Sequence, residues 1–351
     1  MTSLTIQAFL AAGLALTGCL SSAPAPKPVP IDDPVPMLLA LNKGEDTVSL
    51  INMNDGTTIK KLKTGPNPNE VATSPNEEWA LISDMGAGQQ RPGYTFTVVD
   101  LKKKEVARTV DLRPNGAPHG VVWLNDSRVI YTSHMTDSVC IFDFKTDKVI
   151  KAIPTEQKGT HLVLPSPDQM RAYAVNAFSN TVTVIDLVEE KVIKQITCGN
   201  RAEGISLSPD GGLLACGNVG GDTVSIIDTA KLEVVKTLED TPGPIRTFFV
   251  NEGANLVVSC ANTGELAVFK TYDCSLATTI KLGEQKVKIE AQNNHIVPMN
   301  FCALPDGRHF LVVLVTSDAV AKVDAKTWEV TQLFKTGPVP DGIDVAYPKE
   351  N

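Results

Sequence analysis

Seven polar positions recur along this chain at intervals of about 41 to 54 residues, and their side chains are of kinds that bind ligands or carry protons. Each one stands at the start of a short apolar stretch. They are too far apart in the sequence to form a local motif, so they can act together only if the fold brings them together. The positions are Asn69-Glu70, His119, His161, Glu203, Arg246, Asn300 and Asp341.

These residue types permit several kinds of chemistry. His119, His161 and Glu203 could bind a divalent metal ion through two imidazoles and a carboxylate. The same groups could act as general base and oxyanion partner toward a lactone or ester. Arg246, opposite Glu203 and Asp341, could instead hold a carboxylate or phosphate. Alternatively, the groups only bond to one another and to water. The chain contains no HExxH, GxSxG or Walker sequence that would favour catalysis.

The elements that must position these residues are repeated strands. A segment of alternating character that ends in an acidic, amide or Lys residue, such as TVSIID, occurs seven times. The copies lie at 47–52, 96–100, 138–143, 181–186, 223–228, 265–270 and 319–324. Around them recur apolar strands and turns such as Ser-Pro-Asp-Gly, in which proline presets φ and glycine supplies a positive φ. Four strands in a repeat of about 42 residues are typical of a β-propeller blade.

The sequence therefore predicts an all-β, seven-bladed β-propeller over residues 37–351, with four antiparallel strands in each blade. The last strand, at 341–348, has no partner after it, and the first three strands, from residue 37, have none before them. We expect the C-terminal strand to join the N-terminal blade, because this closes the ring and removes two exposed sheet edges.

The polar positions are expected to meet around one mouth of the central tunnel. His134, with Met135, lies in a loop between the second and third strands of its blade, on the same face, and His295 precedes Asn300. Only His309 falls on the opposite face. Two longer segments, at 84–94 and 283–298, are expected to enlarge the face of the mouth. The predicted ligand-binding set is His119, His134, His161, Glu203, Arg246, Asn300 and Asp341.

The repeats AYAVN…NTVTVID and ISLSPDG resemble those of the YncE-like family of YVTN-repeat propellers, exported lipoprotein type. The resemblance covers residues 37–351 and implies the same fold. It implies less about function, because propellers of this kind include binding proteins, lactonases and parts of redox enzymes.

The N-terminus predicts export. Residues 4–18 are apolar and uncharged, as in a signal peptide, and they end in Leu-Thr-Gly-Cys, which resembles the lipobox of bacterial lipoproteins. We therefore expect a signal peptide at 1–18, lipidation of Cys19 and a Pro-rich linker at 19–36 that holds the propeller at a membrane, in the periplasm or on the cell surface. No Lys or Arg precedes the apolar run, so cleavage near Ala23 and secretion as a soluble protein is the alternative.

Composition limits the possible partners. A net charge of −8 and a pI near 5.2 argue against nucleic-acid binding. The six cysteines after Cys19 form no CxxC and are expected to be free thiols. We expect a monomer that meets the membrane only through its anchor. It would bind a small ligand, a divalent metal or a partner protein at the tunnel mouth. The alternatives are a lactonase-type hydrolase that uses the same His/Glu/Arg cluster and a non-catalytic interaction scaffold.

Overall fold

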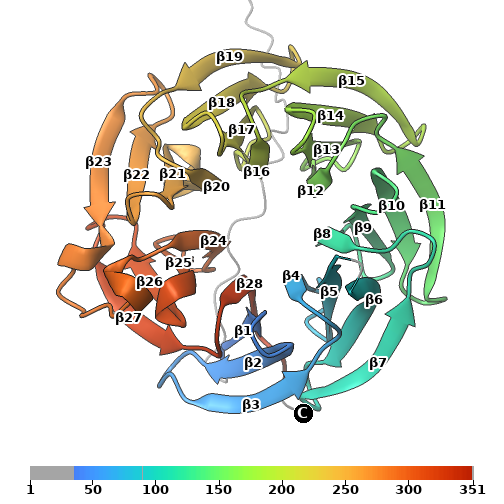
Figure 1. Ribbon diagram of the computed structural model, residues 1–351, viewed down its shortest axis with the longest axis horizontal. Coiled ribbons are helices and arrows are strands. Elements are labelled where there is room, and N and C mark those ends of the chain that lie inside the picture. Colours follow the sequence, from blue (N-terminus) through green and yellow to red (C-terminus); the bar gives the residue numbers. More distant parts are fainter. Residues whose placement is uncertain (1–34, 89, 350–351) are drawn as a thin grey trace, which may run out of the picture.

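The computed structural model describes residues 35–88 and 90–349 and confirms the predicted propeller. Seven four-stranded antiparallel sheets surround a central axis (Figure 1). The first sheet has the order β28-β1-β2-β3, so the last strand closes the ring as expected. In the described part of the chain the helices are short 3-10 turns, at η1 (Asn251–Gly253), η2 (Leu282–Glu284), η3 (Gln292–Asn294) and η4 (Val315–Ser317).

The strands of each sheet follow from the axis outward. The closing sheet contains β28 (Pro340–Ala346), β1 (Met37–Asn42), β2 (Thr47–Asn52) and β3 (Thr58–Lys63). The next two contain β4 (Pro68–Thr73), β5 (Trp79–Ala87), β6 (Arg91–Asp100) and β7 (Glu105–Asp111), then β8 (Pro118–Trp123), β9 (Arg128–Ser133), β10 (Ser138–Asp143) and β11 (Lys148–Pro154). The fourth and fifth contain β12 (Thr160–Pro165), β13 (Arg171–Asn176), β14 (Thr181–Asp186) and β15 (Lys191–Thr197), then β16 (Ala202–Leu207), β17 (Leu213–Asn218), β18 (Thr223–Asp228) and β19 (Glu233–Leu238). The last two contain β20 (Pro244–Val250), β21 (Asn255–Cys260), β22 (Glu265–Lys270) and β23 (Leu276–Lys281), then β24 (Pro298–Ala303), β25 (His309–Leu314), β26 (Ala319–Asp324) and β27 (Val330–Lys335).

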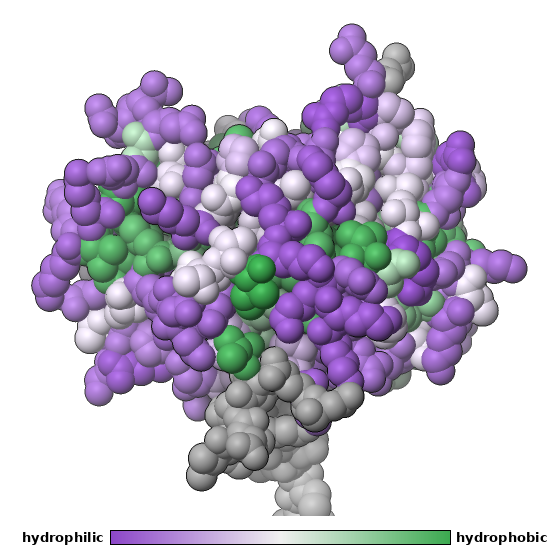
Figure 2. Space-filling view, turned by 90° about the horizontal axis from the view of Figure 1, so that it is seen from below, coloured by the Kyte–Doolittle hydropathy of each residue, from purple (hydrophilic) through white to green (hydrophobic). Residues whose placement is uncertain are grey.

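The repeated TVSIID segment forms the third strand of its blade, and its final Asp starts the next turn. Asp228 accepts hydrogen bonds through Oδ1 from the backbone N–H groups of Ala230 and Lys231, at 3.0 and 2.9 Å. Such an Asx turn offers the backbone a local partner and ends the strand. The apolar side chains pack between neighbouring sheets, as Leu50 of β2 does in a cluster with Val71 and Ile82. Figure 2 shows one side of the ring, which is mainly hydrophilic with small separate hydrophobic areas.

Each of the seven innermost strands contains a β-bulge near its start. In β4, for example, Pro68 pairs with Asp84 and Val71 pairs with Ile82, so the two residues between Pro68 and Val71 oppose the single residue Ser83. The same shift occurs in β8, β12, β16, β20, β24 and β28. A bulge bends the strand and re-aims its side chains. It therefore directs the residues just after each strand start toward the tunnel.

The two longer segments, at 84–94 and 283–298, form different structures. Residues 84–94 extend the β5–β6 hairpin, where Ala87 pairs with Arg91. In the segment at 283–298, Val287 and Ile289 pack against the core cluster that contains Val330. The expectation that this whole insertion enlarges the mouth is therefore wrong in part, because its apolar side chains pack against the core between two blades. Only its end returns to the mouth, where His295 Nε2 lies 3.0 Å from the Ala261 carbonyl oxygen.

Candidate functional site

The predicted positions all lie at the bulges of the innermost strands, which surround the axis (Figure 1). The sequence analysis predicted that these residues form a single ring, but the pairing registers divide them into two tiers. The first bulge residue supplies Asn69, His119, His161, Glu203 and Asp341, and the second supplies Glu70, Arg246 and Asn300. The backbone N–H of the second bulge residue does not pair with the backbone of the neighbouring strand. In β20 that N–H, from Arg246, donates to Ser259 Oγ at 2.9 Å.

Three histidines gather at the mouth. The rings of His119 and His161, from β8 and β12, have centroids 3.9 Å apart, and the His134 ring lies 5.8 Å from that of His161. Phe178, in the loop between β13 and β14, has its ring 6.0 Å from His134. Its side chain is exposed, as is that of Met135. The structure therefore brings together imidazoles from consecutive blades, with apolar side chains beside them.

His161 is paired with Glu203. Its Nε2 lies 3.1 Å from Glu203 Oε1, and Arg201 Nε lies 3.8 Å from the other carboxylate oxygen. Burial raises the pKa of Glu203, but the hydrogen bond from His161 and the nearby positive charges outweigh it and lower the pKa to about 2. Glu203 is therefore ionised at neutral pH and holds the His161 ring in place.

The other two histidines are held in the neutral form. Burial lowers the pKa of His119 well below its usual value, and the neighbouring His161 and Arg246 add to the shift. Burial and His161 also lower the pKa of His134, although Asp137 and Glu203 oppose the shift. His119 Nδ1 and His161 Nδ1 are buried and have no hydrogen-bond partner in the described part of the protein. Neutral imidazoles are the form that coordinates metals.

Sequence reasoning missed Lys43, which belongs to the loop between β1 and β2. Its Nζ donates to Asn69 Oδ1 and to Asp341 Oδ2, both at 2.8 Å. Lys43 stands in the same type of loop as His134, between the second and third strands of a blade, and this position was the signal that could have identified it. The contact satisfies one oxygen of Asp341 and leaves Oδ1 without a partner among the described residues.

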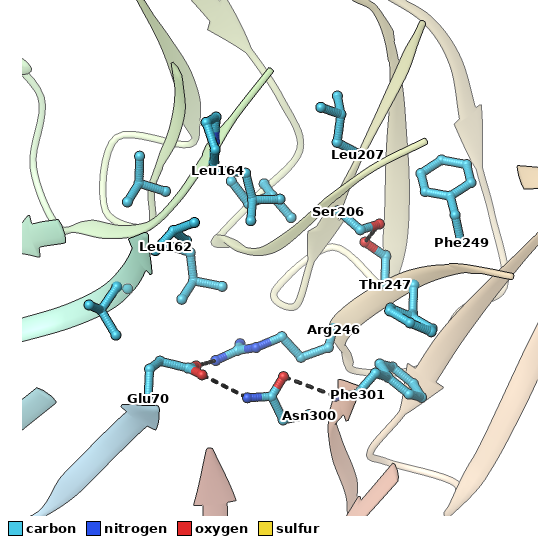
Figure 3. Close-up of a pocket in the computed structure, with 17 residues that line it drawn as sticks. Glu70, Leu162, Leu164, Ser206, Leu207, Arg246, Thr247, Phe249, Asn300 and Phe301 are labelled. Carbon is cyan, nitrogen blue, oxygen red and sulfur yellow. Dashed lines mark hydrogen bonds and ion pairs between the residues drawn. The ribbon is translucent and has the colours of Figure 1, made fainter. Parts of the chain in front are cut away.

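The second tier closes one end of a cavity of about 350 Å³ (Figure 3). Arg246 Nη2 lies 3.2 Å from Glu70 Oε1, and Asn300 Nδ2 donates to Glu70 Oε2 at 2.8 Å. The rest of the wall comes from residues farther along the innermost strands, including Leu164, Leu207 and Phe249. The sequence analysis did not anticipate this cavity.

The structure does not support the predicted metal site. Within residues 35–88 and 90–349, no group of three or more His, Cys, Asp or Glu residues is arranged to hold a metal ion. The rings of His119 and His161 lie close together with an interplanar angle of 38°, and Glu203 uses an oxygen to contact His161. Glu203 thus pairs with His161, and the buried Nδ1 atoms of His119 and His161 have no partner among the described residues, whereas the prediction required all three side chains to converge on one point.

Comparison with known proteins gives the family. Residues 129–346 match the family described as the cytochrome D1 heme domain. This chain belongs to that family. The resemblance to YncE-like propellers is therefore confirmed for the fold only. Membership in the cytochrome D1 heme domain family explains the same repeats.

The relatives of this family member include two proteins named NirF. The chain is 28% identical to NirF of Pseudomonas aeruginosa over 169 residues, which cover 45% of the chain and 40% of that protein. It is 24% identical to NirF of Stutzerimonas stutzeri over 166 residues, which cover 46% of the chain and 41% of that protein. The match thus spans about two fifths of the length of either relative.

Several solved structures share the fold. A functionally unknown protein from Desulfotomaculum acetoxidans has a TM-score of 0.71 at 12% identity and covers 89% of this chain and 99% of its own. Kuenenia stuttgartiensis hydrazine synthase has a TM-score of 0.67 at 18% identity, over 82% of this chain and 91% of its own. Dihydro-heme d1 dehydrogenase NirN, in complex with DHE, has a TM-score of 0.64 at 12% identity, over 89% of this chain and 75% of its own.

The mouth of this cytochrome d1 heme domain protein has the chemistry that a haem requires. Haem iron is commonly held by a histidine, and the His134 ring is neutral and only partly buried. Phe178 and Met135, with exposed fractions of 71% and 50%, could cover an apolar macrocycle. Arg201 and Lys43 could neutralise its carboxylates. The residues present therefore fit a haem.

Proposed function

We propose that this propeller binds a haem of the d1 type at the histidine-lined mouth of its tunnel. The observation that carries the proposal is the cluster of His119, His134 and His161, drawn from two consecutive blades and bordered by exposed Phe178. The family match supports the choice of ligand. When bound, a haem supplies a redox-active iron, and the protein determines its position and surroundings.

The chain's own residues have distinct roles in this proposal. His134 is the iron ligand, because it is the least buried of the three rings and is neutral at pH 7. His161, fixed by Glu203, and His119 lie behind it and keep its ring in position. Phe178 and Met135 exclude water from the face of the ligand, and Arg201 pairs with a carboxylate. The remaining predicted ligand residues, Arg246, Asn300 and Asp341, have no direct role in this proposal.

Haem binding is the first prediction. Mixing the purified protein with haem, either d1 or iron protoporphyrin IX, is expected to shift the haem absorption band as the iron gains an imidazole ligand. His134→Ala should weaken binding at least ten-fold, because a ligand bond to iron is lost. Absorption titration measures both the spectral shift and the dissociation constant.

A matched control comes from the other face of the propeller. His309 Nδ1 lies 2.7 Å from Asp306, in the turn between β24 and β25, far from the mouth. His309→Ala should bind haem as the wild type does. If wild-type protein binds neither haem, or if His134→Ala, His119→Ala and His161→Ala all retain wild-type affinity and spectrum, the proposed function is wrong.

We further propose that the propeller is exported and anchored through Cys19. The signal peptide at 1–18, the lipid-bearing residue and nearly all of the linker at 19–36 lie outside the described residues. No helix in the described ranges has the length and apolar character needed to cross a membrane. The acidic net charge of −8 and the apolar N-terminal run support export without nucleic-acid contact.

Lipidation is the second prediction. Full-length protein expressed in a bacterium with labelled palmitate is expected to carry the label and to sediment with membranes, because acylation holds it there. Cys19→Ser should remove the label and release the protein. A soluble, unlabelled wild-type protein whose mature N-terminus lies near Ala23 would show that the alternative, simple secretion, is correct.

The other functions stay as predictions with their own tests. The His161–Glu203 pair resembles an imidazole oriented by a carboxylate, so a lactonase-type hydrolase would act on a panel of lactones and lose that activity in His161→Ala. A scaffold would bind a partner protein without any small ligand. The expected monomer is tested by light scattering.

A further inference from the structure

The 350 Å³ cavity is separate from the histidine cluster. Its walls are formed by the innermost strands, from their second bulge residues to residues farther along, such as Pro165 and Leu207 at the ends of β12 and β16. The cavity therefore extends away from the mouth toward the face of the Ser-Pro-Asp-Gly turns. The three clustered histidines do not line it, and Gly120 is the nearest lining residue to His119 along β8. Its volume is at the small end of the range of about 300 to 1,000 Å³ that is usual for small-molecule sites.

One end of this cavity is polar and the other is apolar. Arg246, 6% exposed, spans the polar end, and its Nε has no hydrogen-bond partner among the described residues. The Ser206 and Thr247 hydroxyls, 2.8 Å apart, lie on the adjoining wall. Beyond them the wall consists of aliphatic and aromatic side chains, including Leu164, Leu207 and Phe249 (Figure 3). This arrangement suits an amphiphile with one charged end.

Glycines at the polar end let neighbouring innermost strands approach each other closely. The second bulge residue is Gly120 in β8 and Gly204 in β16, so these blades place no side chain at that level. Among the second bulge residues of the described blades, Arg246 is the only cation, and its acidic partner is Glu70. An unpartnered guanidinium N–H on a buried side chain is costly unless an acceptor reaches it.

We propose that this cavity is a second binding site, distinct from the haem mouth, for a medium-chain aliphatic monocarboxylic acid. Its carboxylate would bind Arg246 Nε and one Nη in the bidentate manner typical of arginine, and its chain would lie against Leu164, Leu207 and Phe249. The site does not depend on the proposed haem function, since none of the three clustered histidines contributes to it.

Ligand binding at this site is coupled to a proton. Burial already raises the pKa of Glu70, against the lowering effect of Arg246, and Asp341 adds to the rise. A second carboxylate on the same guanidinium brings another negative charge close to Glu70, so two carboxylates share one cation and one proton. Glu70 therefore takes up a proton from solvent when the acid binds as its anion.

Calorimetric titration with n-octanoate tests the proposal. We expect one site per chain, with proton uptake that is visible as a dependence of the heat on buffer ionisation. Across butanoate, hexanoate and octanoate the affinity should rise roughly four-fold for each added CH₂, until the chain fills the cavity. Glu70→Gln should bind octanoate more tightly and without proton uptake, because the competing carboxylate is gone.

Variants that remove the cation test directly whether Arg246 binds the carboxylate. Glu70→Gln/Arg246→Gln places two neutral amides side by side, which keeps the fold, and it should bind octanoate at least ten-fold more weakly than Glu70→Gln. Arg201→Gln, an exposed arginine at the mouth, and His134→Ala should both bind as wild type does. Absence of octanoate binding, equal affinity of the single and double variants, or loss in Arg201→Gln would overturn the second site and leave the haem proposal untouched.

Discussion

Asp84→Asn is expected to stabilise the protein at pH 8 by up to roughly 4 kcal/mol and to have little effect at pH 4. Asp84 lies within β5 and is fully buried. Its Oδ2 accepts hydrogen bonds from Thr95 and Thr97 at 2.8 and 2.9 Å, while Oδ1 has no partner among the described residues. Burial raises the pKa of Asp84 to about 7, although the bonds from Thr95, Thr97 and Gly65 oppose the shift.

The direction of the pH effect follows from this raised pKa. The folded state holds the Asp84 proton more tightly than the unfolded state, in which the carboxyl has its ordinary pKa of 3.8. The stability that this proton contributes is complete below about pH 4 and is lost as the pH rises through about 7. An amide carries no such titration, so the variant and the wild type should diverge across this window.

Other blades of the same protein show why asparagine fits. Asn218 occupies the matching place in β17, where its Nδ2 donates to Thr223 and Ser225 at 3.0 Å and its Oδ1 accepts from Gly199 N–H at 3.0 Å. Asn42 accepts from Gly337 in the same way. An asparagine at 84 can make both kinds of bond, with Thr95 and Thr97 as acceptors.

Urea denaturation of the two proteins at several pH values between 4 and 8 measures the effect. The reverse substitution, Asn218→Asp, is the matched control and should lose stability as the pH rises over the same window. If Asp84→Asn and wild type differ by the same amount at pH 4 and pH 8, the buried carboxyl does not titrate as described.

Gly204→Ala is expected to destabilise the fold by about 3 kcal/mol, near the upper end of ordinary overpacking. A Cβ atom at Gly204 would lie 2.1 Å from the Ile245 carbonyl oxygen and 2.9 Å from the Arg246 Cα. Both are backbone atoms of β20, the innermost strand of the next blade. Relief of the clash requires two blades to separate, so rotation of a side chain cannot accommodate the methyl group.

The matched control is Gly283→Ala, because a Cβ there would meet nothing within 4 Å. This variant should change the free energy of unfolding by less than about 0.5 kcal/mol. Urea midpoints for the two variants and the wild type give the comparison. Equal midpoints for Gly204→Ala and Gly283→Ala would show that the close approach of β16 and β20 is not required for stability.

The candidate site was predictable only in part. The repeat spacing correctly placed His119 and His161 on neighbouring innermost strands, and the type of loop placed His134 on the same face. The sequence left open that these groups bond to one another, but it did not show which pairs form, as His161 does with Glu203, and it missed the contact of Lys43 with Asp341. The repeat spacing predicts on which strand a residue lies and how far along the axis, but it does not predict the direction of a long side chain.

The sequence alone determined the ring of blades, because alternation, Asx turns and strand length are local properties that recur in every repeat. It also determined how the ring closes, since the strand at 340–346 had a single open position to fill. Tertiary structure decided which polar groups meet. The bulge in each innermost strand turns two consecutive residues toward the axis, and glycines at some of these places let the backbone of the neighbouring blade approach closely. Those contacts join residues from different blades, so no single repeat contains the information that specifies them.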